Sequence, residues 1–361
     1  MFSPLAFKGK NVFITGHTGF KGAWLTQWLL EMGANVTGFS LPPAYPSSLY
    51  EILNHTAFIN DHHANILDFE FLSDALITSK PDYIFHLAAQ AIVSSSYSDP
   101  LNTINSNVLG TSNLLQAVRT ISHPCVLICI TSDKAYFNSE WSWGYRENDR
   151  LGGTDIYSGS KGAAELIISS FFHSFLSSPD CPIRLGVARA GNVIGGGDWA
   201  SDRLIPDIYS CWYRSQSLEV RSPFSTRPWQ HVLEPLCGYL TLADNLSRNP
   251  KLSGEAFNFG PSSVLTFTVK QIIEDLFRLY PSNDFQPFVL SPTSTFKESS
   301  LLKLNCDKAY HHLSWESTLS YNQMLSFVSD WYVAFQHSPS SLPQLTSSQI
   351  SSFTHFTNVQ A

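Results

Sequence analysis

The sequence predicts an α/β fold in which a doubly wound parallel sheet carries a smaller, mixed α/β domain. In the first half of the 361 residues, short apolar runs alternate with helical patterns of ordinary length. Such alternation is the signature of βαβ units and a parallel sheet. The pattern then breaks at the consecutive glycines 195–197, and shorter elements follow. A length of 361 residues also fits roughly two domains.

The expected strands are short apolar runs, at residues 11–15, 35–39, 57–59, 83–87, 126–131 and 185–188. The expected helices between them space their apolar residues helically, at residues 24–32, 69–79, 102–120 and 157–175. Beyond the glycine break, further helices are expected at residues 204–212, 234–246 and 269–279. Residues 338–361 carry no charged side chain and are rich in Ser, Thr and Gln, so we expect a flexible C-terminal tail.

Composition argues against several classes of protein. The net charge is -7, from 22 Lys+Arg against 29 Asp+Glu, and no basic run marks a nucleic-acid surface. The six cysteines form no CxxC pair, so we expect neither a metal site nor a disulfide framework. No apolar run approaches the roughly 18 residues of a membrane span, and no signal peptide precedes the first strand. We therefore expect a cytoplasmic protein that binds neither membrane nor nucleic acid.

A glycine-rich turn follows the first expected strand. Gly16, Gly19 and Gly22 form G-x-x-G-x-x-G where the first helix begins. Glycine allows the backbone to turn tightly and to approach a pyrophosphate, whose charge is met by amides at the helix N-terminus. The turn therefore predicts a Rossmann-type dinucleotide site, with Lys21 and His17 as further candidates for phosphate contacts. The alternative is a strand-helix turn without a ligand.

The second expected strand lacks the acidic residue that usually holds an adenosine ribose. Residues 32–50 include no charged side chain, and Ser40 stands at the expected place. With neither an acid for a ribose diol nor an arginine for a 2'-phosphate, this strand does not separate NAD from NADP.

Two further segments carry acid-base chemistry. Tyr157 and Lys161 lie four residues apart on one face of an expected helix. A neighbouring ammonium stabilises a phenolate, so this pair can form a base for a hydroxyl proton. Ser132, Asp133 and Lys134 follow the strand expected at residues 126–131 and form an acid-base candidate at the same crevice. The alternatives are an exposed polar pair and a turn that Asp133 caps.

Together these motifs resemble the extended short-chain dehydrogenase/reductase family, and within it the nucleotide-sugar dehydratases, most of all the CDP-glucose 4,6-dehydratases. The resemblance rests on seven segments: GHTGFKG at 16–22, HLAAQ at 86–90, TSDKAY at 131–136, WGYREN at 143–148, YSGSK at 157–161, GGDWASDRLIP at 196–206 and RPWQHVLEP at 227–235. The last two segments discriminate most, because the glycine turn and the Tyr-Lys pair occur throughout the superfamily.

The resemblance implies a lyase that recycles NAD as a hydride carrier and converts CDP-D-glucose to CDP-4-dehydro-6-deoxy-D-glucose and water. Tyr157 would deprotonate the 4-hydroxyl, Lys161 would hold the cofactor ribose, and Ser132 would bond the 4-oxygen. Water would then leave across C5 and C6 with help from Asp133, before hydride returns to C6. Lys134 is either the base at C5 or electrostatic support; the CDP-glucose enzymes share this Asp-Lys pair, whereas dTDP-glucose enzymes have Asp-Glu.

The resemblance also implies a set of binding residues and a division of the chain. Besides Tyr157 and Lys161, the cofactor would be bound by Gly16, Thr18, Gly19, Phe20, Lys21, Gly22, Ser40, Asn65, Ile66, Leu87, Ala88, Ala89 and Asn107. The nucleotide-sugar would be bound by Asn192, Arg203, Arg227 and His231. Residues 1–190 and 231–258 would form the cofactor domain, and residues 191–230 and 259–337 the sugar domain. The chain departs from its relatives at Gly159, where they usually have Asn, and at Asn65, where Asp is common.

Three alternatives remain open. The same scaffold supports nucleotide-sugar epimerases, which need Ser132, Tyr157 and Lys161 but have no use for Asp133 and Lys134. A dehydratase acting on a UDP-, GDP- or dTDP-hexose is a second alternative, and a nucleotide-sugar-binding protein without turnover is a third. The resemblance further implies a homodimer or dimer of dimers, joined through the helices at residues 102–120 and 157–175.

Overall fold

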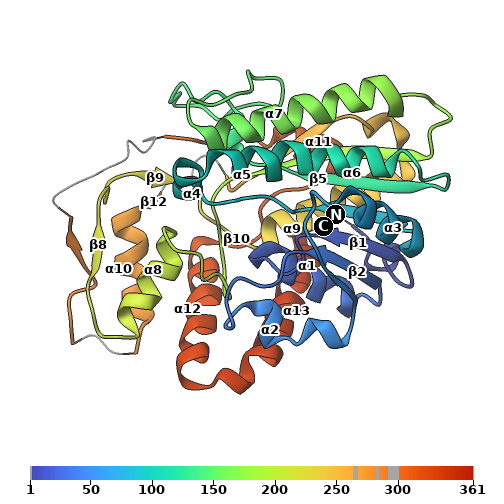
Figure 1. Ribbon diagram of the computed structural model, residues 1–361. Coiled ribbons are helices and arrows are strands. Elements are labelled where there is room, and N and C mark those ends of the chain that lie inside the picture. The colour runs from blue at the N-terminus through green and yellow to red at the C-terminus, as the bar shows by residue number, and fades with distance from the viewer. Residues whose placement is uncertain (1, 263–266, 282–283, 292–300, 361) are drawn as a thin grey trace.

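A seven-stranded parallel sheet forms the centre of the computed structural model, which describes residues 2–262, 267–281, 284–291 and 301–360 (Figure 1). Its strand order is β11-β6-β5-β4-β1-β2-β3, and all six pairings are parallel. The strands are β1 (Asn11–Thr15), β2 (Asn35–Ser40), β3 (Asn60–His63), β4 (Tyr83–His86), β5 (Cys125–Ile130), β6 (Ile183–Ala190) and β11 (Ala256–Phe259). The chain winds outward from β1 in both directions, which confirms the predicted doubly wound sheet.

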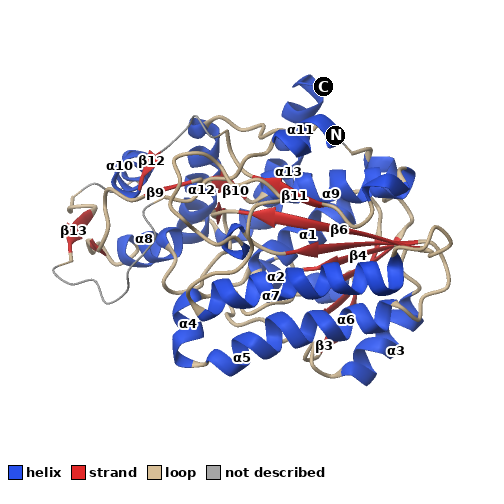
Figure 2. Cartoon of the chain, turned by 90° about the horizontal axis from the view of Figure 1, so that it is seen from above, coloured by secondary structure: helices blue, strands red, loops and turns tan. Residues whose placement is uncertain are grey.

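Helices cover both faces of this sheet, as a parallel sheet requires (Figure 2). Alternate residues of β1 enter two separate cores: Val12 and Ile14 pack on one side, and Phe13 on the other. The first core includes α1 (Phe20–Glu31) and α9 (Leu233–Arg248). The second includes α3 (Phe69–Ser79), α6 (Gly110–Val118) and α7 (Ile156–Phe171). The sheet is therefore buried on both faces.

Two of the predicted helices contain a wider π-helical turn. The helix predicted at residues 102–120 consists of α5 (Pro100–Ile104), the π-turn η3 (Asn105–Leu109) and α6. Likewise, α7 continues into the π-turn η5 (Phe172–Leu176). Such turns are rare and occur frequently at functional sites. The first of them carries Asn107, one of the predicted cofactor residues.

After β6, the described part of the chain adds three two-stranded sheets and several helices. Its strand pairs are β7 (Val193–Ile194) with β10 (Gln230–His231), β9 (Thr226–Arg227) with β12 (Phe267–Thr268), and β8 (Leu218–Val220) with β13 (Phe288–Leu290). Its helices are α8 (Leu204–Trp212), α10 (Val269–Leu279), α11 (Asp307–Leu313) and α12 (Tyr321–His337). Figure 1 shows α8, α10 and their small strands beside the main sheet.

One predicted strand is misplaced. Residues 57–59 were expected to form the third strand, but a short 3-10 helix, η2 (His55–Ala57), stands there, and β3 begins at Asn60. The strand has the polar sequence NDHH because it is the edge of the sheet, where one face is lined by the polar side chains Asp61 and His63. Apolar content is a poor guide to such a strand.

The expected flexible tail is instead a packed helix. Residues Leu342–Gln360 form α13, whose Leu342, Ile350 and Phe353 are buried. Phe353 meets the Trp28 ring of α1 edge to face at 5.7 Å between centroids. The Trp331 indole of α12 donates to the Thr346 hydroxyl at 3.2 Å. Buried threonines lie on the same face of the helix as these apolar residues. The face that packs is therefore wider than its aliphatic residues alone indicate.

Among the described residues, no helix is both long and apolar enough to cross a bilayer.

Candidate active site

The glycine-rich turn connects β1 to α1 and lies against the loop that follows β4. Gly16 has a φ of +79°, and a Cβ there would lie 2.7 Å from the Ala88 nitrogen. A Cβ at Gly22 would lie 2.1 Å from the Gly16 carbonyl oxygen. At Gly19, which caps α1, the closest neighbour of a Cβ would be that same oxygen at 3.4 Å. The turn is therefore tight underneath and leaves room beside the helix N-terminus, which fits the pyrophosphate of a dinucleotide.

The ends of β2 and β3 border this turn. The Thr18 hydroxyl lies 2.8 Å from that of Ser40 and donates to the Leu41 carbonyl at 2.9 Å, so it joins the turn to the end of β2. Asn65 accepts a hydrogen bond from the Leu67 amide at 3.0 Å, and Ile66 packs beneath Gly110 of α6. All of these side chains are neutral. The end of β2 therefore offers the hydroxyl of Ser40 to a ribose in place of the usual carboxylate.

The loop after β4 is tied to α7 through Asn107. The Asn107 amide donates to the Gln90 carbonyl at 3.1 Å and to the Ser160 hydroxyl at 2.9 Å, and its oxygen accepts from the Gln90 amide at 2.8 Å. Ser160 in turn donates to the Tyr157 carbonyl at 2.7 Å. Asn107 thus positions the segment containing Leu87, Ala88 and Ala89 against the helix of the Tyr-Lys pair.

A buried carboxyl group follows β5. Ser132 caps the 3-10 helix η4 (Asp133–Ala135): its oxygen accepts from the Lys134 amide at 3.2 Å, and its hydroxyl donates to Asp133 Oδ1 at 2.9 Å. Among the described residues, the buried Asp133 Oδ2 has no hydrogen-bond partner. Burial raises the pKa of Asp133, and the charge of the half-buried Lys134 only partly opposes that shift. The site therefore holds a carboxyl group with a greater tendency to be protonated.

Tyr157 and Lys161 lie buried in the first turns of α7, against which η4 packs. Burial raises the pKa of Tyr157 to about 12, although the Ser132 hydroxyl and the Arg203 charge oppose this shift. Burial also lowers the pKa of Lys161 to about 8. The sequence argument expected the ammonium to depress the phenol pKa, whereas in the folded chain desolvation is the larger effect on both groups.

The residues predicted to bind a nucleotide-sugar lie beyond the carboxyl ends of β6 and the small strands. Arg203 precedes α8 and donates to Asp198 at 2.8 Å. The Asn192 carbonyl accepts from the Gln230 amide at 3.2 Å, which brings the segment after β6 beside β10. Arg227 lies in β9 and donates to the Thr226 carbonyl at 2.9 Å. Arg203 is near enough to influence the pKa of Tyr157. A Cβ at Gly191, beside Asn192, would lie 3.2 Å from Asp133 Oδ2 and 3.2 Å from Pro228, which follows Arg227.

The comparisons with known proteins agree with this geometry. The family model described as GDP-mannose 4,6 dehydratase matches residues 13–178. CDP-glucose 4,6-dehydratase of Salmonella typhimurium is 43% identical over 332 residues, which cover 91% of this chain and 92% of that protein. The chain belongs to the family of the CDP-glucose 4,6-dehydratases.

Solved structures more distant than this dehydratase family share the fold. UDP-glucose 4-epimerase from Thermotoga maritima, solved with UDP-glucose, has a TM-score of 0.77 at 20% identity, with 89% of this chain and 98% of that one covered. dTDP-glucose 4,6-dehydratase from Bacillus anthracis, solved in complex with NAD, has a TM-score of 0.73 at 20% identity, with coverage of 90% and 96%. These likenesses support the Rossmann-type fold.

Two residues predicted to contact ligands lie buried in this dehydratase fold. His231, predicted to bind substrate, is 0% exposed and is packed edge to face against Trp24 and Phe327. Burial lowers the pKa of His231 to about 3, so it is a neutral residue of the core. His17, considered for a phosphate contact, is also fully buried and bonds to Asp61 at 2.8 Å. His231 therefore lies among aromatic core residues, whereas His17 lies in a polar contact with β3.

Lys21 keeps a place near the site. Burial lowers the pKa of Lys21 to about 8, and the cations Arg203 and Lys161 lower it further. Asp133 and Asp198 act in the opposite direction. The Lys21 side chain is therefore within electrostatic range of the catalytic candidates as well as part of the glycine turn.

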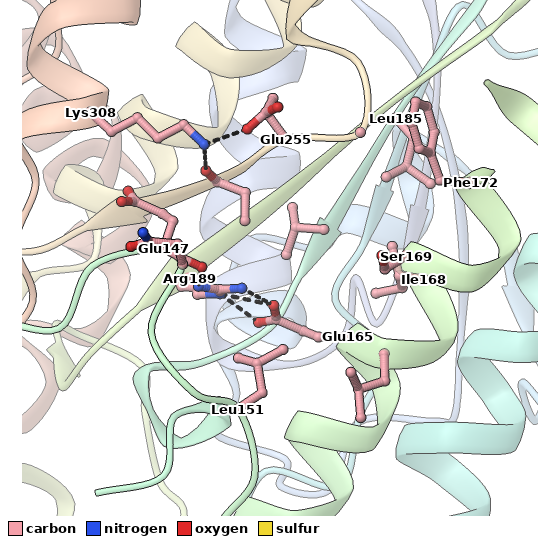
Figure 3. Close-up of a pocket in the computed structure, with 15 residues that line it drawn as sticks. Glu147, Leu151, Glu165, Ile168, Ser169, Phe172, Leu185, Arg189, Glu255 and Lys308 are labelled. Carbon is pink, nitrogen blue, oxygen red and sulfur yellow. Dashed lines mark hydrogen bonds and ion pairs between the residues drawn. The ribbon is translucent and has the colours of Figure 1, made fainter. Parts of the chain in front are cut away.

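A buried ion pair that the sequence motifs do not include lies behind Lys161. Glu165, one turn further along α7, is bonded by Arg189 of β6 through two bonds from Nε, at 2.8 and 2.9 Å, and through a guanidinium nitrogen (Figure 3). The Thr131 hydroxyl donates to Glu165 at 2.6 Å. Glu165 raises the pKa of Lys161 against the effect of burial. The signal was available in the sequence, because positions 157, 161 and 165 share one helix face.

The cavity of about 370 Å³ drawn in Figure 3 lies next to this ion pair and is separate from the candidate active site. Its lining includes Glu147, Glu165, Arg189 and Lys308, and neither Asp133 nor Tyr157.

Proposed function

We propose that this chain is a hydro-lyase that converts CDP-D-glucose to CDP-4-dehydro-6-deoxy-D-glucose and water. The observation that carries the proposal is the buried Asp133 beside Ser132, with a raised pKa and an oxygen that is unpartnered among the described residues. Epimerisation at C4 has no step for such an acid, whereas loss of the 6-hydroxyl requires a proton donor. The Salmonella relative, 43% identical over nearly the whole chain, supports CDP-glucose as the substrate.

The first stage is oxidation of the sugar at C4. Tyr157 acts as the phenolate, a form that burial disfavours and that the Ser132 hydroxyl and the Arg203 charge favour, and it takes the proton of the 4-hydroxyl. Ser132 hydrogen-bonds the 4-oxygen from the adjacent turn. Lys161 holds the ribose and stabilises the phenolate by its charge, which is maintained by Glu165 one turn away. Bound NAD supplies the acceptor for the C4 hydride and later the donor of that hydride to C6. NAD rather than NADP is proposed because the dTDP-glucose 4,6-dehydratase structure holds NAD.

The second stage is elimination of water. The 4-ketone acidifies the C5 proton, and its removal breaks the C5–H bond as the C6–O bond breaks. Asp133, in its protonated form, gives its proton to the departing 6-hydroxyl, which leaves as water. Lys134 adjoins Asp133 and is the proposed partner at C5, as the base or as a charge that stabilises the enolate. Hydride then adds at C6 and a proton at C5, which gives the 4-keto-6-deoxy sugar.

Conversion of CDP-glucose in deuterated water tests this function. The purified chain with NAD should yield a 4-keto-6-deoxy product with one deuterium at C5, detected by NMR and mass spectrometry. Tyr157→Phe should yield none, because the base is lost while the fold is kept. Conversion of UDP-, GDP- or dTDP-glucose but not of CDP-glucose would refute CDP-glucose as the substrate. A C4 epimer that retains its 6-hydroxyl, or binding without turnover, would refute dehydration.

The nucleotide-sugar site is proposed to lie where the two parts of the chain meet. Arg203 and Arg227 would bind the diphosphate, for which guanidinium groups are suited, and Asn192 would add a neutral hydrogen bond. In this division, residues 1–190 and 231–258 hold the cofactor, and residues 191–230 and 259–337 hold the sugar nucleotide. The position of β11 at the edge of the main sheet supports this interleaving.

A homodimer in the cytoplasm is the proposed state of the enzyme. The outer surfaces of α5 and α7 expose large apolar side chains, including Leu101, 69% exposed, and Leu166, 58% exposed. The two helices contact each other, so a second copy could cover both. All six cysteines are free, which suits a reducing compartment.

A further inference from the structure

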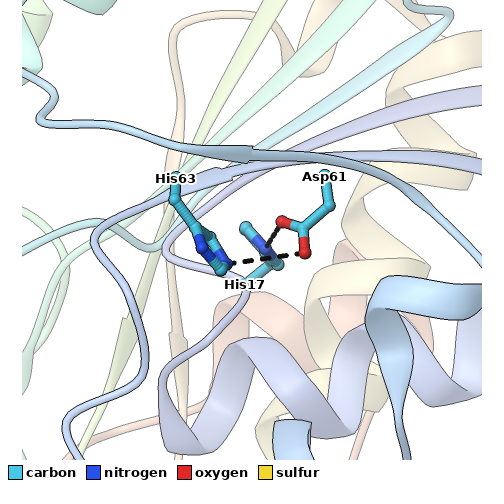
Figure 4. Close-up of side chains that lie close together, drawn as sticks. All are labelled: His17, Asp61 and His63. Carbon is cyan, nitrogen blue, oxygen red and sulfur yellow. Dashed lines mark hydrogen bonds and ion pairs between the residues drawn. The ribbon is translucent and has the colours of Figure 1, made fainter.

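A cluster of histidine, aspartate and tyrosine side chains lies on the α1 side of β3, beneath the glycine-rich turn. His17 reaches it from that turn, Asp61 and His63 from β3, and Tyr50 from α2 (Leu49–Ile52). His17 Nε2 lies 2.8 Å from Asp61 Oδ1, and His63 Nε2 lies 3.5 Å from Asp61 Oδ2. Figure 4 shows both imidazole rings directed toward the carboxylate. None of these side chains has a part in the proposed dehydration.

The ligand atoms of the three side chains lie close together. One nitrogen from each histidine and one carboxylate oxygen all lie within 4.8 Å of one another. Zinc binds histidine nitrogen and carboxylate oxygen at about 2.0–2.2 Å, so an ion between the three atoms requires only small side-chain movements. In the part of the chain that the structure describes, no other three His, Cys, Asp or Glu side chains come together in this way.

The cluster is held in place by its surroundings. The His17 ring is fixed against the backbone of β2, where a Cβ at Gly38 would lie 2.6 Å from it. The Asp61 carboxylate accepts hydrogen bonds from the hydroxyls of Tyr50 and Thr56. Such outer hydrogen bonds orient the ligands in protein metal sites. The cluster therefore has prearranged ligands and a supporting set of donors.

The cluster is also open to solvent on one side. The His17 side chain is inaccessible, but the His63 side chain is 39% exposed, so an ion can enter beside it. Two histidines and one carboxylate leave a fourth tetrahedral position for water. Soft thiolate ligands are absent from this set, and two nitrogens favour zinc over magnesium or calcium, which prefer oxygen.

We propose that His17, Asp61 and His63 form a binding site for one divalent transition-metal ion of the zinc type. The ion would join the glycine-rich turn to the edge strand β3 through three protein ligands. The site lies outside the catalytic candidates, so it does not depend on the proposed function.

Metal titration of the full chain tests the site. The protein, freed of any histidine tag and treated with EDTA, is titrated with zinc chloride by calorimetry. We expect one ion per chain with a Kd of about 1 μM or tighter, roughly -8 kcal/mol. Cobalt(II) should give the visible absorption of a tetrahedral complex, which reports ligand geometry rather than mere association. Magnesium should give no saturable heat.

Two neighbouring histidines provide a matched pair of variants. His63→Ala removes an exposed ligand and should weaken zinc at least about tenfold. His62 precedes His63 in β3, and its ring packs against Phe71 on the opposite face of the strand. His62→Ala should therefore leave zinc affinity unchanged. Circular dichroism of both metal-free variants checks their folding. Equal loss of zinc affinity in the two variants, or no saturable zinc binding by wild type below about 100 μM, would overturn the proposal. Turnover of CDP-glucose is measured in a separate assay, so the proposed function is tested independently.

Discussion

At the scale of single residues, the candidate site owes its properties to burial more than to pairs of charges. Tyr157 and Lys161 share a helix face, as the sequence predicts, yet burial raises the pKa of the phenol to about 12 and lowers that of the amine to about 8. Asp133 follows the same physics, because desolvation favours its neutral form. Sequence spacing identified these groups, but only their depth in the fold determines which proton each tends to hold.

Asp133→Asn should separate the two stages of the reaction. Asparagine keeps the shape and can accept the Ser132 hydrogen bond, but it cannot donate a proton to a leaving hydroxyl. We expect dehydration to fall about 10²–10⁴-fold while hydride transfer from C4 stays detectable. Absorbance of the reduced nicotinamide in single turnovers follows the first stage, and product NMR follows the second. Equal losses in both stages would contradict the assigned role.

Glu234 provides a test of pH dependence away from the site. It is buried at the start of α9 and accepts hydrogen bonds from the amides of Thr318 and Leu319. Burial raises the pKa of Glu234 to about 7, above the roughly 4.3 of an unfolded chain. Its contribution to the free energy of unfolding is therefore fully present below about pH 4.3 and is lost as pH rises through about 7.

Glu234→Gln should flatten this pH dependence. Between pH 5 and 8, wild type should lose up to about 3 kcal/mol of unfolding free energy relative to the variant, as measured by urea denaturation. The slope is diagnostic, because the new amide also places an unpaired donor in the core. The exposed Glu219, changed to Gln, is the control and should leave the slope as in wild type. If the free energy of unfolding changes with pH in the same way for Glu234→Gln and wild type, the buried acid is not the cause of the pH dependence.

At the scale of elements, periodicity predicted the interior helices and failed where the surroundings determine the structure. The helix at residues 69–79 was predicted with the bounds it has, because an amphipathic pattern follows the capping residue Asp68. The edge strand β3 was predicted too early in the chain, because its side chains are polar and form hydrogen bonds with each other and with neighbouring residues. Helix α13 was missed because its buried face includes Thr346 and Gln349, whose hydrogen-bond partners lie on α12. Such tertiary partners cannot be read from local sequence.

Phe353→Ala tests whether α13 is part of the folded core. Phe353 is fully buried against Trp28, so its truncation should lower the free energy of unfolding by about 3–5 kcal/mol, as measured by urea denaturation. The adjacent Ser352 is exposed, and Ser352→Ala should change stability by less than about 0.5 kcal/mol. A change that small for Phe353→Ala would support the flexible tail that the sequence suggested.

At the scale of the whole molecule, the sequence predicted a doubly wound sheet and a crevice at its carboxyl edge, and both the fold and the family are confirmed. The turn at Gly16–Gly22, the loop after β4, η4 and the segment after β6 all follow neighbouring parallel strands, so they meet at one edge. Topology thereby gathers distant motifs without any local signal. The His231 side chain is buried in the core, a depth that its motif does not reveal.

Charge substitution on the outer helices tests the proposed dimer. Leu101→Glu combined with Leu166→Glu would place two carboxylates in an apolar interface and should convert a dimer into monomers in light scattering coupled to size exclusion. Leu290, 66% exposed on β13, offers a control of similar exposure outside those helices. Leu290→Glu should remain dimeric. A dimer that persists in the double variant would place the subunit contact elsewhere.

The contact between Trp28 and Phe353 also has a consequence for biosynthesis. The indole on the first long helix is covered by a ring that the ribosome adds about 325 residues later. At a synthesis rate of about 5–20 residues per second, this apolar surface waits roughly 16–65 s for its cover. Nascent chains of this protein should therefore engage chaperones through α1 until translation has passed the last helix, and a stall near residue 340 should leave them prone to aggregate.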